Sequence, residues 1–205
     1  MTLSPDPLVW LVNADAVDEA SLDFHAALLG SSERARCAHF LRPERRRQFI
    51  IGRTLLRRML GRLLAIDPAT ILLEERAGQS PELMFPREFL GGFSISHSGC
   101  WVACAASIHT GLGIDIERVD PERDVLALAE QAFGPVDLAF LRACTPAERH
   151  SNFYQLWCQH EARFKLGTFS AMDYVLQWPG LAGVLACAKP LCAAPSLVQV
   201  HLDTC

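Results

Sequence analysis

The sequence predicts an α+β protein built from two small lobes. Its 205 residues are enough for one domain or for two small, closely packed ones. Short apolar runs typical of strands and longer segments with helical spacing are mixed along the chain. Half of the residues are hydrophobic and one fifth are charged, which is ordinary for a folded globular protein and argues against disorder.

The chain is expected to begin with a strand and to continue with helices. The apolar run Leu8 to Val12 suits a buried strand, and Asp15 to Leu29 is expected to be helical. Ser32 and Glu33 open a second helical stretch that leads into an arginine-rich segment. Apolar residues recur there at helical spacing: Phe49, Gly52, Leu56, Met59, Leu60 and Leu63. We therefore predict an amphipathic helix with most of its arginines on a solvated face.

A hairpin and a further strand are predicted in the middle of the chain. Gly78 to Pro81 is turn material, and Phe93 to Ser96 then alternates like a half-buried strand. Trp101 to Ile108 is its expected hairpin partner. Two glycines then introduce the strand Ile114 to Glu117.

The last part of the chain is expected to hold two helices and a strand. Val125 to Phe133 has a helical pattern. Thr145 to Glu148 combines a capping hydroxyl, a proline at the first helical position and a glutamate at the third, which predicts a helix start. That helix is expected to run to Lys165 and to stop at Gly167. Leu197 to Leu202 resembles a strand.

Composition narrows the possible partners and location. A formal charge of −4 argues against a general nucleic-acid binder. No apolar run approaches the ~20 residues of a membrane span, and Met1 to Trp10 lacks the layout of a signal peptide. The cysteines have no paired spacing and are expected to be buried thiols in a reducing compartment, so we expect a cytoplasmic protein with no membrane partner. They are Cys37, Cys100, Cys104, Cys144, Cys158, Cys187, Cys192 and Cys205.

One local excess of positive charge stands out against the acidic total. Eight arginines lie in the stretch from Arg42 to Arg62, where Glu44 is the one acidic residue of the sequence, while the other acidic residues are spread elsewhere. An anionic partner could dock on such a segment. The eight are Arg42, Arg45, Arg46, Arg47, Arg53, Arg57, Arg58 and Arg62.

Asp115 and Glu117 form a candidate half of a metal site. Side chains two residues apart in a strand share a face, so these carboxylates project together while Ile114 and Ile116 face the core. Two carboxylates without a nearby histidine or cysteine suit a hard cation such as Mg²⁺. The alternative is a pair of solvated acids on an edge strand, and the Asp-x-Glu pattern alone favours that alternative.

The helix after Thr145 carries a second candidate pair, Glu161 and Lys165. With Trp157 they form a row at intervals of four beside an expected core stripe. Glu161 could then serve as a metal ligand or general base, and Lys165 could face a phosphate. An ordinary surface Glu–Lys pair is the alternative. The stripe comprises Phe153, Leu156, His160 and Phe164.

Ser96, His97 and Ser98 lie at a strand end before a glycine. Backbone amides and small hydroxyls in such a place can meet an anion. A histidine at this position is more often only a turn residue. No glycine-flanked nucleophilic serine with a paired base is evident, which argues against a serine protease.

Three segments in this order resemble the signature motifs of the surfactin-type 4'-phosphopantetheinyl transferases. They are Phe93 to Gly99, Gly113 to Glu117 and Trp157 to Gly167. The arginine-rich region Ser32 to Arg62 is also similar to the N-terminal half of that family. The resemblance extends over residues 8–175, and its specificity comes from the combination of motifs.

The resemblance implies two similar α+β lobes related by a pseudo-twofold axis, with the active site in the cleft between them. The boundary is expected near residue 108. Residues 1–108 would form the lobe on the nucleotide side of coenzyme A, and residues 109–205 the lobe with the metal and the catalytic helix.

The resemblance also implies roles for the acidic residues. Asp115, Glu117 and Glu161 match the family's ligands for Mg²⁺, for which Mn²⁺ could substitute. Glu161 would also be the base toward the carrier serine. Lys165 would contact the phosphate being transferred, and Asp115 and Lys165 join Glu161 as the expected catalytic residues.

On the coenzyme A side, the resemblance implies contacts to the 3'-phosphate of the nucleotide. Ser96 and His97 would hold this phosphate together with an arginine matching Arg36. Arg47 or Arg76 could join them.

The chain departs from the family pattern at three places. His160 stands where the family has a lysine, and Gly78 to Pro81 lacks the usual basic residue. Both changes remove fixed positive charge near coenzyme A, where His160 would face the phosphates. The loop after Lys165 is short, in a region that the family uses to shape the cleft.

The implied activity is transfer of 4'-phosphopantetheine from coenzyme A to a serine of an acyl or peptidyl carrier protein, by an enzyme expected to act as a monomer. One alternative is a magnesium-dependent phosphohydrolase or nuclease. Nucleases of the Asp then Glu-x-Lys type place the lysine two residues after the acid, whereas Glu161 and Lys165 are four apart. A degenerate, non-catalytic coenzyme A-binding protein is the other alternative, and the presence of all three carboxylates argues against it.

Overall fold

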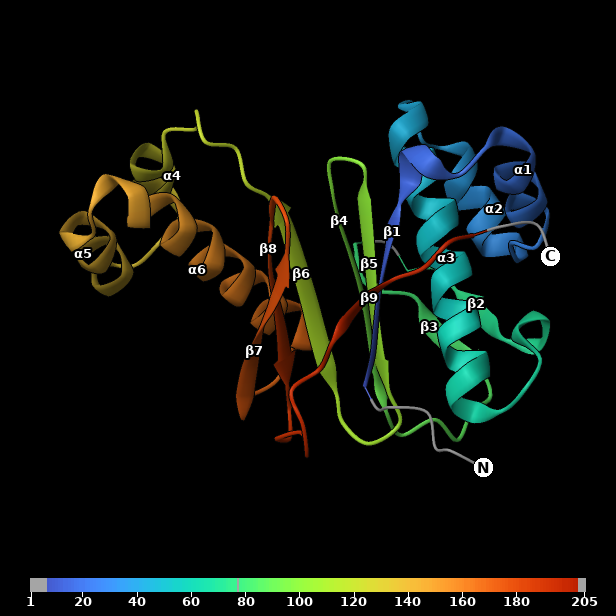
Figure 1. Cartoon of the computed structure of the whole chain (residues 1–205). Helices are drawn as coiled ribbons and strands as arrows, with labels where there is room; N and C mark the ends of the chain where they lie inside the picture. Colours follow the sequence, from blue (N-terminus) through green and yellow to red (C-terminus); the bar gives the residue numbers. More distant parts are fainter. Residues whose placement is uncertain (1–6, 77, 203–205) are drawn as a thin grey trace.

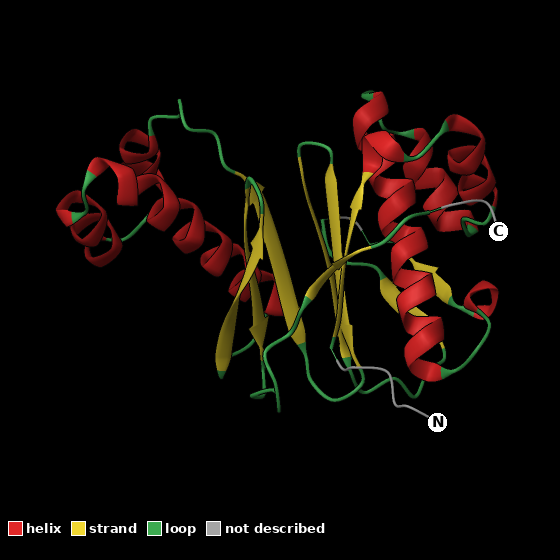
Figure 2. Ribbon diagram, in the orientation of Figure 1, coloured by secondary structure: helices red, strands yellow, loops and turns green. Residues whose placement is uncertain are grey.

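The computed structural model describes residues 7–76 and 78–202, and it is an α+β protein as predicted. Two antiparallel-rich sheets face each other in the middle of the molecule, and helices cover the outer face of each sheet (Figures 1 and 2). The order of layers is therefore helix, sheet, sheet, helix.

The first sheet has the strand order β4-β5-β1-β9. β1 (Leu8–Asn13) pairs antiparallel with β5 (Trp101–Ser107), which forms a hairpin with β4 (Gly92–Ser98). These three strands confirm the predicted ones. β9 (Leu197–Gln199) returns from the far end of the chain and pairs parallel with β1.

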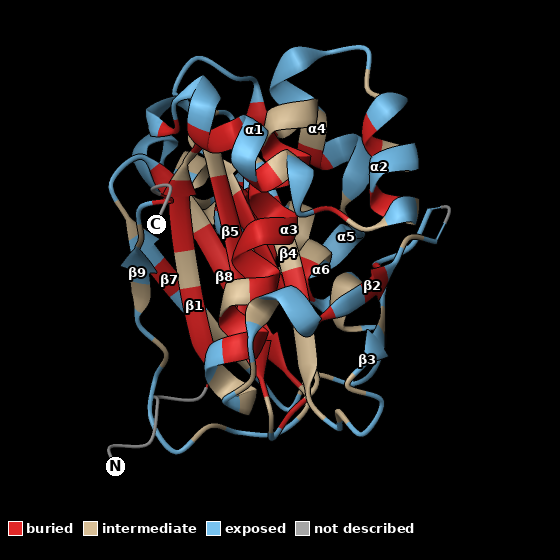
Figure 3. Cartoon of the chain, turned by 90° about the vertical axis from the view of Figure 1, so that its right-hand side faces the viewer, coloured by how far each residue is buried: buried red, intermediate tan, exposed pale blue. Residues whose placement is uncertain are grey.

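Helices cover the outer face of this sheet. A 3₁₀ turn, η1 (Ala14–Ala16), precedes α1 (Glu19–Ala27), and α2 (Ser31–Ala38) leads into the long α3 (Pro43–Leu64). The apolar face of α3 lies on β5, β4 and β1. Figure 3, which is coloured by burial, shows that much of α3 is buried. A second 3₁₀ turn, η2 (Pro68–Thr70), follows α3.

The arginines of α3 are not all on a solvated face, which corrects the prediction for two of them. Arg53 and Arg57 are only 6% and 8% exposed. Arg57 forms an ion pair with Glu33, which is fully buried, and Arg53 forms one with Glu75. The guanidinium group can be buried here because each one meets a carboxylate and keeps its hydrogen bonds.

A two-stranded sheet of β2 (Leu72–Glu74) and β3 (Glu82–Phe85) lies beyond η2. The sequence pattern did not reveal it, because strands this short have no clear periodicity. The predicted turn at Gly78 to Pro81 lies in the connection between them, where Gly78 has a positive φ of 69°.

The second sheet has the strand order β6-β8-β7 and is antiparallel throughout. Its strands are β6 (Leu112–Arg118), β7 (Met172–Trp178) and β8 (Leu181–Cys187). α6 (Pro146–Leu166) packs on β6 and β8. Two shorter helices, α4 (Val125–Ala132) and α5 (Pro135–Ala143), pack against α6 (Figure 1).

The ends of α6 agree with the prediction. Thr145 and Glu148 form a reciprocal capping box, which satisfies backbone amides of the first turn. Gly167 ends the helix in the left-handed region at φ 70°, which costs glycine little because it has no Cβ.

The face of α6 that packs on the sheet differs from the predicted stripe. The buried residues of this helix include Cys158 and Ala162, whereas Phe164 is 82% exposed and His160 is exposed. Phe153 is buried as predicted, but the buried face then continues through Tyr154, Cys158 and Ala162 and not through the predicted stripe. Cys158 and Ala162 are small, which allows α6 to lie very close to the strands beneath.

The two sheets bury their inner faces against each other. Ile114 and Ile116 are 0% and 1% exposed, which confirms that they face the core. They pack in one cluster with residues of both sheets, so the lobes share this core. The cluster comprises Val9, Leu11, Ala103, Ala105, Leu112, Ile114, Ile116, Leu176, Leu181, Leu185 and Cys187.

Both halves of the chain repeat one order of elements. A strand is followed by helices, the last of them long, and then by a hairpin whose second strand pairs with the first strand of the unit. The sheet orders β4-β5-β1 and β7-β8-β6 correspond. This repetition agrees with two similar lobes, while the exact twofold relation and the boundary near residue 108 stay predictions.

In the described part of the chain, no helix is both long and apolar enough to cross a membrane. The seven described cysteines are free thiols, and Cys37, Cys104, Cys158 and Cys187 are buried as expected. Cys205 lies outside the described residues.

Candidate active site

Asp115 is the central acid of the candidate site. It lies on β6, on the face opposite to Ile114 and Ile116, and is 4% exposed. Its Oδ1 accepts a hydrogen bond of 2.8 Å from Ser96 Oγ. Its Oδ2 is buried and has no hydrogen-bond partner among the described residues. An orphaned carboxylate oxygen is costly unless another group meets it, so this atom is a candidate metal ligand.

Lys165 reaches from α6 to Asp115. Its Nζ lies 2.7 Å from Asp115 Oδ1 and also donates to the backbone oxygen of Ile114 at 3.2 Å and to Ser96 Oγ at 3.1 Å. The lysine thus places one positive charge beside the buried carboxylate. The acid that Lys165 contacts is therefore Asp115, whereas the sequence had paired this lysine with Glu161 on the same helix.

Glu117 follows two residues later on the same face of β6. Its Oε2 accepts a hydrogen bond of 2.6 Å from Ser98 Oγ. Burial raises the pKa of Glu117, and the negative charge of Asp115 raises it further, while the Ser98 hydrogen bond acts in the opposite direction. Asp115 and Glu117 thus share one face of β6, and their mutual repulsion destabilises the ionised pair. A bound cation would reduce this repulsion.

Glu161 lies on α6 and is half-buried, but it is not gathered into a cluster with the other two acids. Within residues 7–76 and 78–202, no three His, Cys, Asp or Glu side chains lie close enough to hold a metal ion. The residues nevertheless fit a hard cation, because Asp115 and Glu117 are adjacent oxygen donors and Asp115 Oδ2 is unpartnered. The role of Glu161 as a third ligand stays a prediction.

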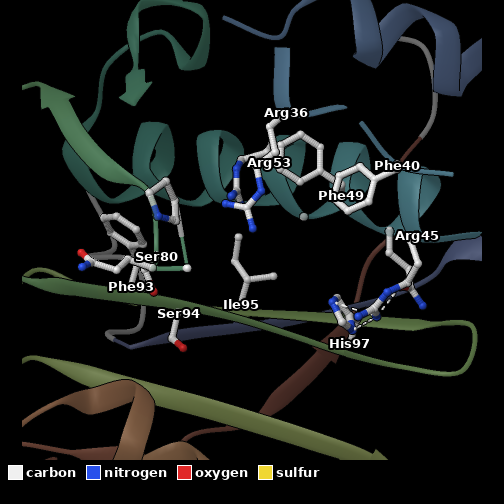
Figure 4. Close-up of a pocket in the computed structure, with 15 residues that line it drawn as sticks. Arg36, Phe40, Arg45, Phe49, Arg53, Ser80, Phe93, Ser94, Ile95 and His97 are labelled. Carbon is white, nitrogen blue, oxygen red and sulfur yellow. Dashed lines mark hydrogen bonds between the residues drawn. The ribbon is translucent and has the colours of Figure 1, made fainter. Parts of the chain in front are cut away.

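A cavity of about 380 Å³ lies between α3 and β4 (Figure 4). Arg36 from α2, Arg45 and Arg53 from α3, and His97 from β4 line it with the loop at Gly78 to Pro81. Phe49 supplies an apolar wall, and the guanidinium of Arg53 lies 4.6 Å from the centre of its ring. Cationic and aromatic groups around one cavity suit an anionic ligand with an aromatic ring.

The positive charge of the cavity is partly balanced by one carboxylate. Glu75 binds Arg36 at 2.6 Å and Arg53 at 2.5 Å. Burial alone would raise the pKa of Glu75, but the hydrogen bonds and charges of Arg53 and Arg36 lower it below its usual value. Two arginines fixed by a single carboxylate keep a net positive charge for a ligand.

His97 lies at the same cavity, against Arg45. Its Nδ1 is 2.9 Å from Arg45 Nη1 (Figure 4). Loss of hydration and the Arg45 cation lower the pKa of His97, so the neutral ring is favoured. The predicted residues Arg36 and His97 are therefore brought together.

Ser96, by contrast, points to the other side of β4. Neighbouring side chains of a strand point to opposite faces, and Ser94 and Ile95 show this in Figure 4. Ser96 is bonded to Asp115 and Lys165 and does not line the cavity with His97. Its predicted contact with the nucleotide is not supported by this placement and stays untested.

Arg47 and Arg76 do not line this cavity. Arg47 donates to the backbone oxygens of Ala14 and Val17 and forms an ion pair with Glu19. Arg76 donates to the backbone oxygen of Ser80 at 3.2 Å, in the loop that forms part of the cavity wall. Neither placement tests their predicted role toward the nucleotide.

His160 contacts α5. Its Nε2 lies 2.9 Å from Asp137 Oδ2, and its ring stacks on Phe133 with centroids 5.3 Å apart. It therefore belongs neither to the buried face of α6 nor to the cavity lined by Arg36. Whether it meets a coenzyme A phosphate stays a prediction.

Arg45 and Arg53 belong to the eight clustered arginines at which the sequence predicts that an anion could dock, but the sequence did not single them out as lining one cavity. Helical spacing alone does not say which arginines face a pocket, and the pairing role of Ser98 was not predicted. The signal for Ser98 was present in its spacing: it is two residues after Ser96, as Glu117 is two residues after Asp115.

Comparison with known proteins identifies the family. A model described as "4'-phosphopantetheinyl transferase, N-terminal" matches residues 17–109, and one described as "4'-phosphopantetheinyl transferase superfamily" matches residues 111–179. The two matches divide the chain between β5 and β6, which are consecutive along the chain and belong to different sheets.

Individual relatives carry the same name. The 4'-phosphopantetheinyl transferase HetI of Nostoc sp. is 32% identical over 80% of this chain and 69% of its own length. A 4'-phosphopantetheinyl transferase of Bacillus subtilis is 30% identical, and the transferase Sfp of the same species is 29% identical, each over 68% of this chain. The chain spans 60% of the length of each Bacillus protein. It belongs to the 4'-phosphopantetheinyl transferase superfamily.

Proposed function

We propose that this protein transfers 4'-phosphopantetheine from coenzyme A to a serine of an acyl or peptidyl carrier protein. The observation that carries the proposal is the arrangement on either side of β4. A basic cavity lies on one face, and the Asp115–Glu117–Lys165 group lies beside the other. Family membership gives this arrangement its chemical meaning.

The nucleotide of coenzyme A is proposed to occupy the cavity between α3 and β4. Arg36, Arg45 and His97 would meet the 3'-phosphate, and Phe49 would lie against the adenine. The volume of about 380 Å³ is in the usual range for a small-molecule site. The pyrophosphate would then extend around the end of β4 toward Asp115, with Lys165 turning from the carboxylate to a phosphate oxygen.

The chemical step is an in-line displacement at phosphorus. The serine hydroxyl of the carrier protein forms a new O–P bond to the β-phosphorus, and the bond to the bridging oxygen breaks, so that 3',5'-adenosine bisphosphate leaves with that oxygen. Glu161 is proposed to take the proton of the serine. Lys165 would stabilise negative charge on the phosphoryl oxygens.

Mg²⁺ is proposed to bind Asp115, Glu117 and Glu161, and when bound it would neutralise charge on the pyrophosphate. The donor set supports this, since all three are carboxylates and Asp115 Oδ2 is unpartnered. The monomeric state and the cytoplasmic location expected from the sequence are part of the same proposal.

Mass spectrometry of apo carrier proteins tests the proposal directly. A panel of acyl and peptidyl carrier proteins is incubated with this protein, coenzyme A and Mg²⁺. The expected result is a gain of one phosphopantetheine on at least one carrier, which disappears in EDTA and returns with Mg²⁺ or Mn²⁺.

Other outcomes separate the alternatives, which the comparisons do not support. Binding of coenzyme A without any mass gain would indicate a non-catalytic binding protein. Hydrolysis of coenzyme A or of nucleic acid without transfer would indicate a phosphohydrolase. Full transfer after exhaustive chelation would contradict the metal assignment alone.

A further inference from the structure

The two sheets meet at an open edge, where β4 and β6 run beside each other but belong to different sheets. β6 pairs with β8 on one side only, so backbone amides on its other side need partners. Ser96 Oγ accepts the N–H of Ile116 at 3.3 Å, and Ser98 Oγ accepts the N–H of Arg118 at 2.9 Å. Side-chain hydroxyls thus replace main-chain pairing between the lobes.

The same two hydroxyls donate to the two acids. Ser96 Oγ donates to Asp115 Oδ1 at 2.8 Å, and Ser98 Oγ donates to Glu117 Oε2 at 2.6 Å. Residues two apart in a strand are separated by about 6.6 Å on one face. The Ser-x-Ser spacing of β4 therefore matches the Asp-x-Glu spacing of β6, and one arrangement occurs twice.

The direction of the Ser96 hydrogen bond is fixed by its neighbours. A serine hydroxyl has one hydrogen to donate and two lone pairs to accept with. The N–H of Ile116 and the ammonium of Lys165 can only donate to Ser96, and the carboxylate of Asp115 accepts from it. The single hydrogen of Ser96 therefore points to Asp115, also when Lys165 turns to a phosphate, and it cannot be donated to a phosphate at the same time.

Each carboxylate is consequently held by one oxygen. For Asp115 the held atom is Oδ1, while Oδ2 stays unpartnered and buried. A fixed carboxylate with one oxygen reserved is pre-organised for a cation, because little freedom is lost when the ion binds.

We infer that Ser96 and Ser98 are positioning residues, which orient Asp115 and Glu117 for a divalent cation and tie this orientation to the contact between the lobes. The inference rests on the proposed function, and it assigns to Ser96 a role different from the nucleotide contact implied by family resemblance. In each case the serine acts through a carboxylate and does not touch coenzyme A.

The test measures binding of Mn²⁺ and of coenzyme A separately. Ser96→Ala and Ser98→Ala are compared with Thr54→Val, which removes a buried hydroxyl whose hydrogen-bond partner among residues 7–76 and 78–202 is the Ile50 carbonyl of its own helix. Free Mn²⁺ is followed by its paramagnetic resonance signal. Coenzyme A and 3'-dephospho-coenzyme A are titrated calorimetrically in EDTA.

We expect each serine variant to weaken Mn²⁺ binding by about tenfold, the range of one hydrogen bond to a charged group. Thr54→Val should bind Mn²⁺ as the wild type does, and Ser98→Thr, which keeps the hydroxyl, should recover most of the affinity. The preference of Ser96→Ala for coenzyme A over the dephospho form should equal that of the wild type.

Two results would overturn the inference: Mn²⁺ affinity within twofold of wild type in both alanine variants, or loss of the 3'-phosphate preference in Ser96→Ala. Circular dichroism and urea midpoints identify a variant that does not fold, and Mn²⁺ binding by the other alanine variant then provides the deciding comparison. If wild type modifies no carrier protein, the proposed function fails; if it does and the Mn²⁺ results are unchanged by the alanines, only the inference fails.

Discussion

Asp115 and Glu117 show how one strand can prepare a charged site at the level of single residues. Their isoleucine neighbours are anchored in the core between the sheets, which fixes the direction of both acids. The pKa of Glu117 is raised, mainly because the side chain is buried and further because Asp115 carries a like charge. Both effects destabilise the ionised form of Glu117. Lys165 partly compensates at Asp115.

Replacing Glu161 by glutamine is expected to reduce transfer to less than a tenth of the wild-type turnover. The amide keeps the shape of the side chain but loses both a ligand charge and the ability to accept the serine proton. Turnover is measured by carrier mass shift, and unfolding by urea. Glu130→Gln, at an exposed acid that forms an ion pair with Arg142, is the matched control and should keep full activity. Activity above one tenth in Glu161→Gln would rule out the assigned role.

His25 is expected to make the protein less stable in mild acid. The side chain is 1% exposed, neither ring nitrogen has a hydrogen-bond partner among the described residues, and burial followed by the Arg58 charge lowers its pKa. The unfolded chain, with a histidine pKa of about 6.5, then binds a proton that the folded protein does not bind. This contribution is fully present above pH ~6.5 and is lost as the pH falls toward the folded value.

His25→Leu should therefore shrink the difference between the urea midpoints at pH 8 and pH 5.5, since the substitution removes the buried titrating ring. His39→Leu, at an exposed histidine, controls for the loss of a histidine as such. Equal pH dependence of His25→Leu and the wild type would show that His25 does not contribute.

The features of single residues that the sequence could predict were those that follow from the alternation of side chains along a strand or from a short motif. The common face of Asp115 and Glu117 followed from strand geometry. The same rule places Ser96 and His97 on opposite faces of β4, although the resemblance had assigned both to one phosphate. The buried pair of Arg53 and Glu75 could not be predicted, because its members lie 22 positions apart and meet only in the folded chain.

At the scale of elements, the position of α6 depends on a glycine in β6. A Cβ added to Gly113 would lie 2.1 Å from the backbone oxygen of Ala162 and 2.6 Å from the backbone nitrogen of Leu166. The helix therefore rests directly on the strand backbone. Since α6 carries Glu161 and Lys165, this close approach sets their distance from Asp115.

Gly113→Ala is expected to push α6 away from β6, to lower the free energy of unfolding by about 1–3 kcal/mol and to reduce transfer at least tenfold. The contacted atoms are backbone, so no side chain can move aside. Gly134→Ala is the control, because its Cβ would meet nothing within 4 Å. Urea unfolding and carrier mass shift are measured for both. Unchanged stability and transfer in Gly113→Ala would contradict the close packing of α6.

Elements with strong local signals were predictable, and those defined by tertiary pairing were not. The capping box and terminal glycine of α6 were present in the sequence, as was the β4–β5 hairpin. The β2–β3 sheet, α5 and the β7–β8 hairpin were missed. The buried strand β8 contains a glycine and two alanines, a composition without a clear strand preference.

At the scale of the whole molecule, the two halves of the chain depend on each other. The inner face of each sheet is covered by the other sheet, with Val9 and Leu11 of β1 packed in one cluster with Ile114 and Leu185. The chain end also crosses back, because β9 pairs with β1 and the buried Leu202 joins the core beneath α3. We propose that the boundary near residue 108 separates two lobes with different functions, while the two lobes share one hydrophobic core.

We therefore expect the full chain to unfold in one cooperative transition and the isolated segment 1–108 to lack one. That fragment keeps α3 but loses both the sheet that covers Val9, Leu11 and Ala103 and the strand that covers the free edge of β1. Calorimetry of the full chain should give equal van't Hoff and calorimetric enthalpies. The fragment should bind a hydrophobic dye and self-associate, and adding segment 109–205 should reduce both effects. A monomeric fragment with its own transition near that of the full chain would show that the lobes fold independently.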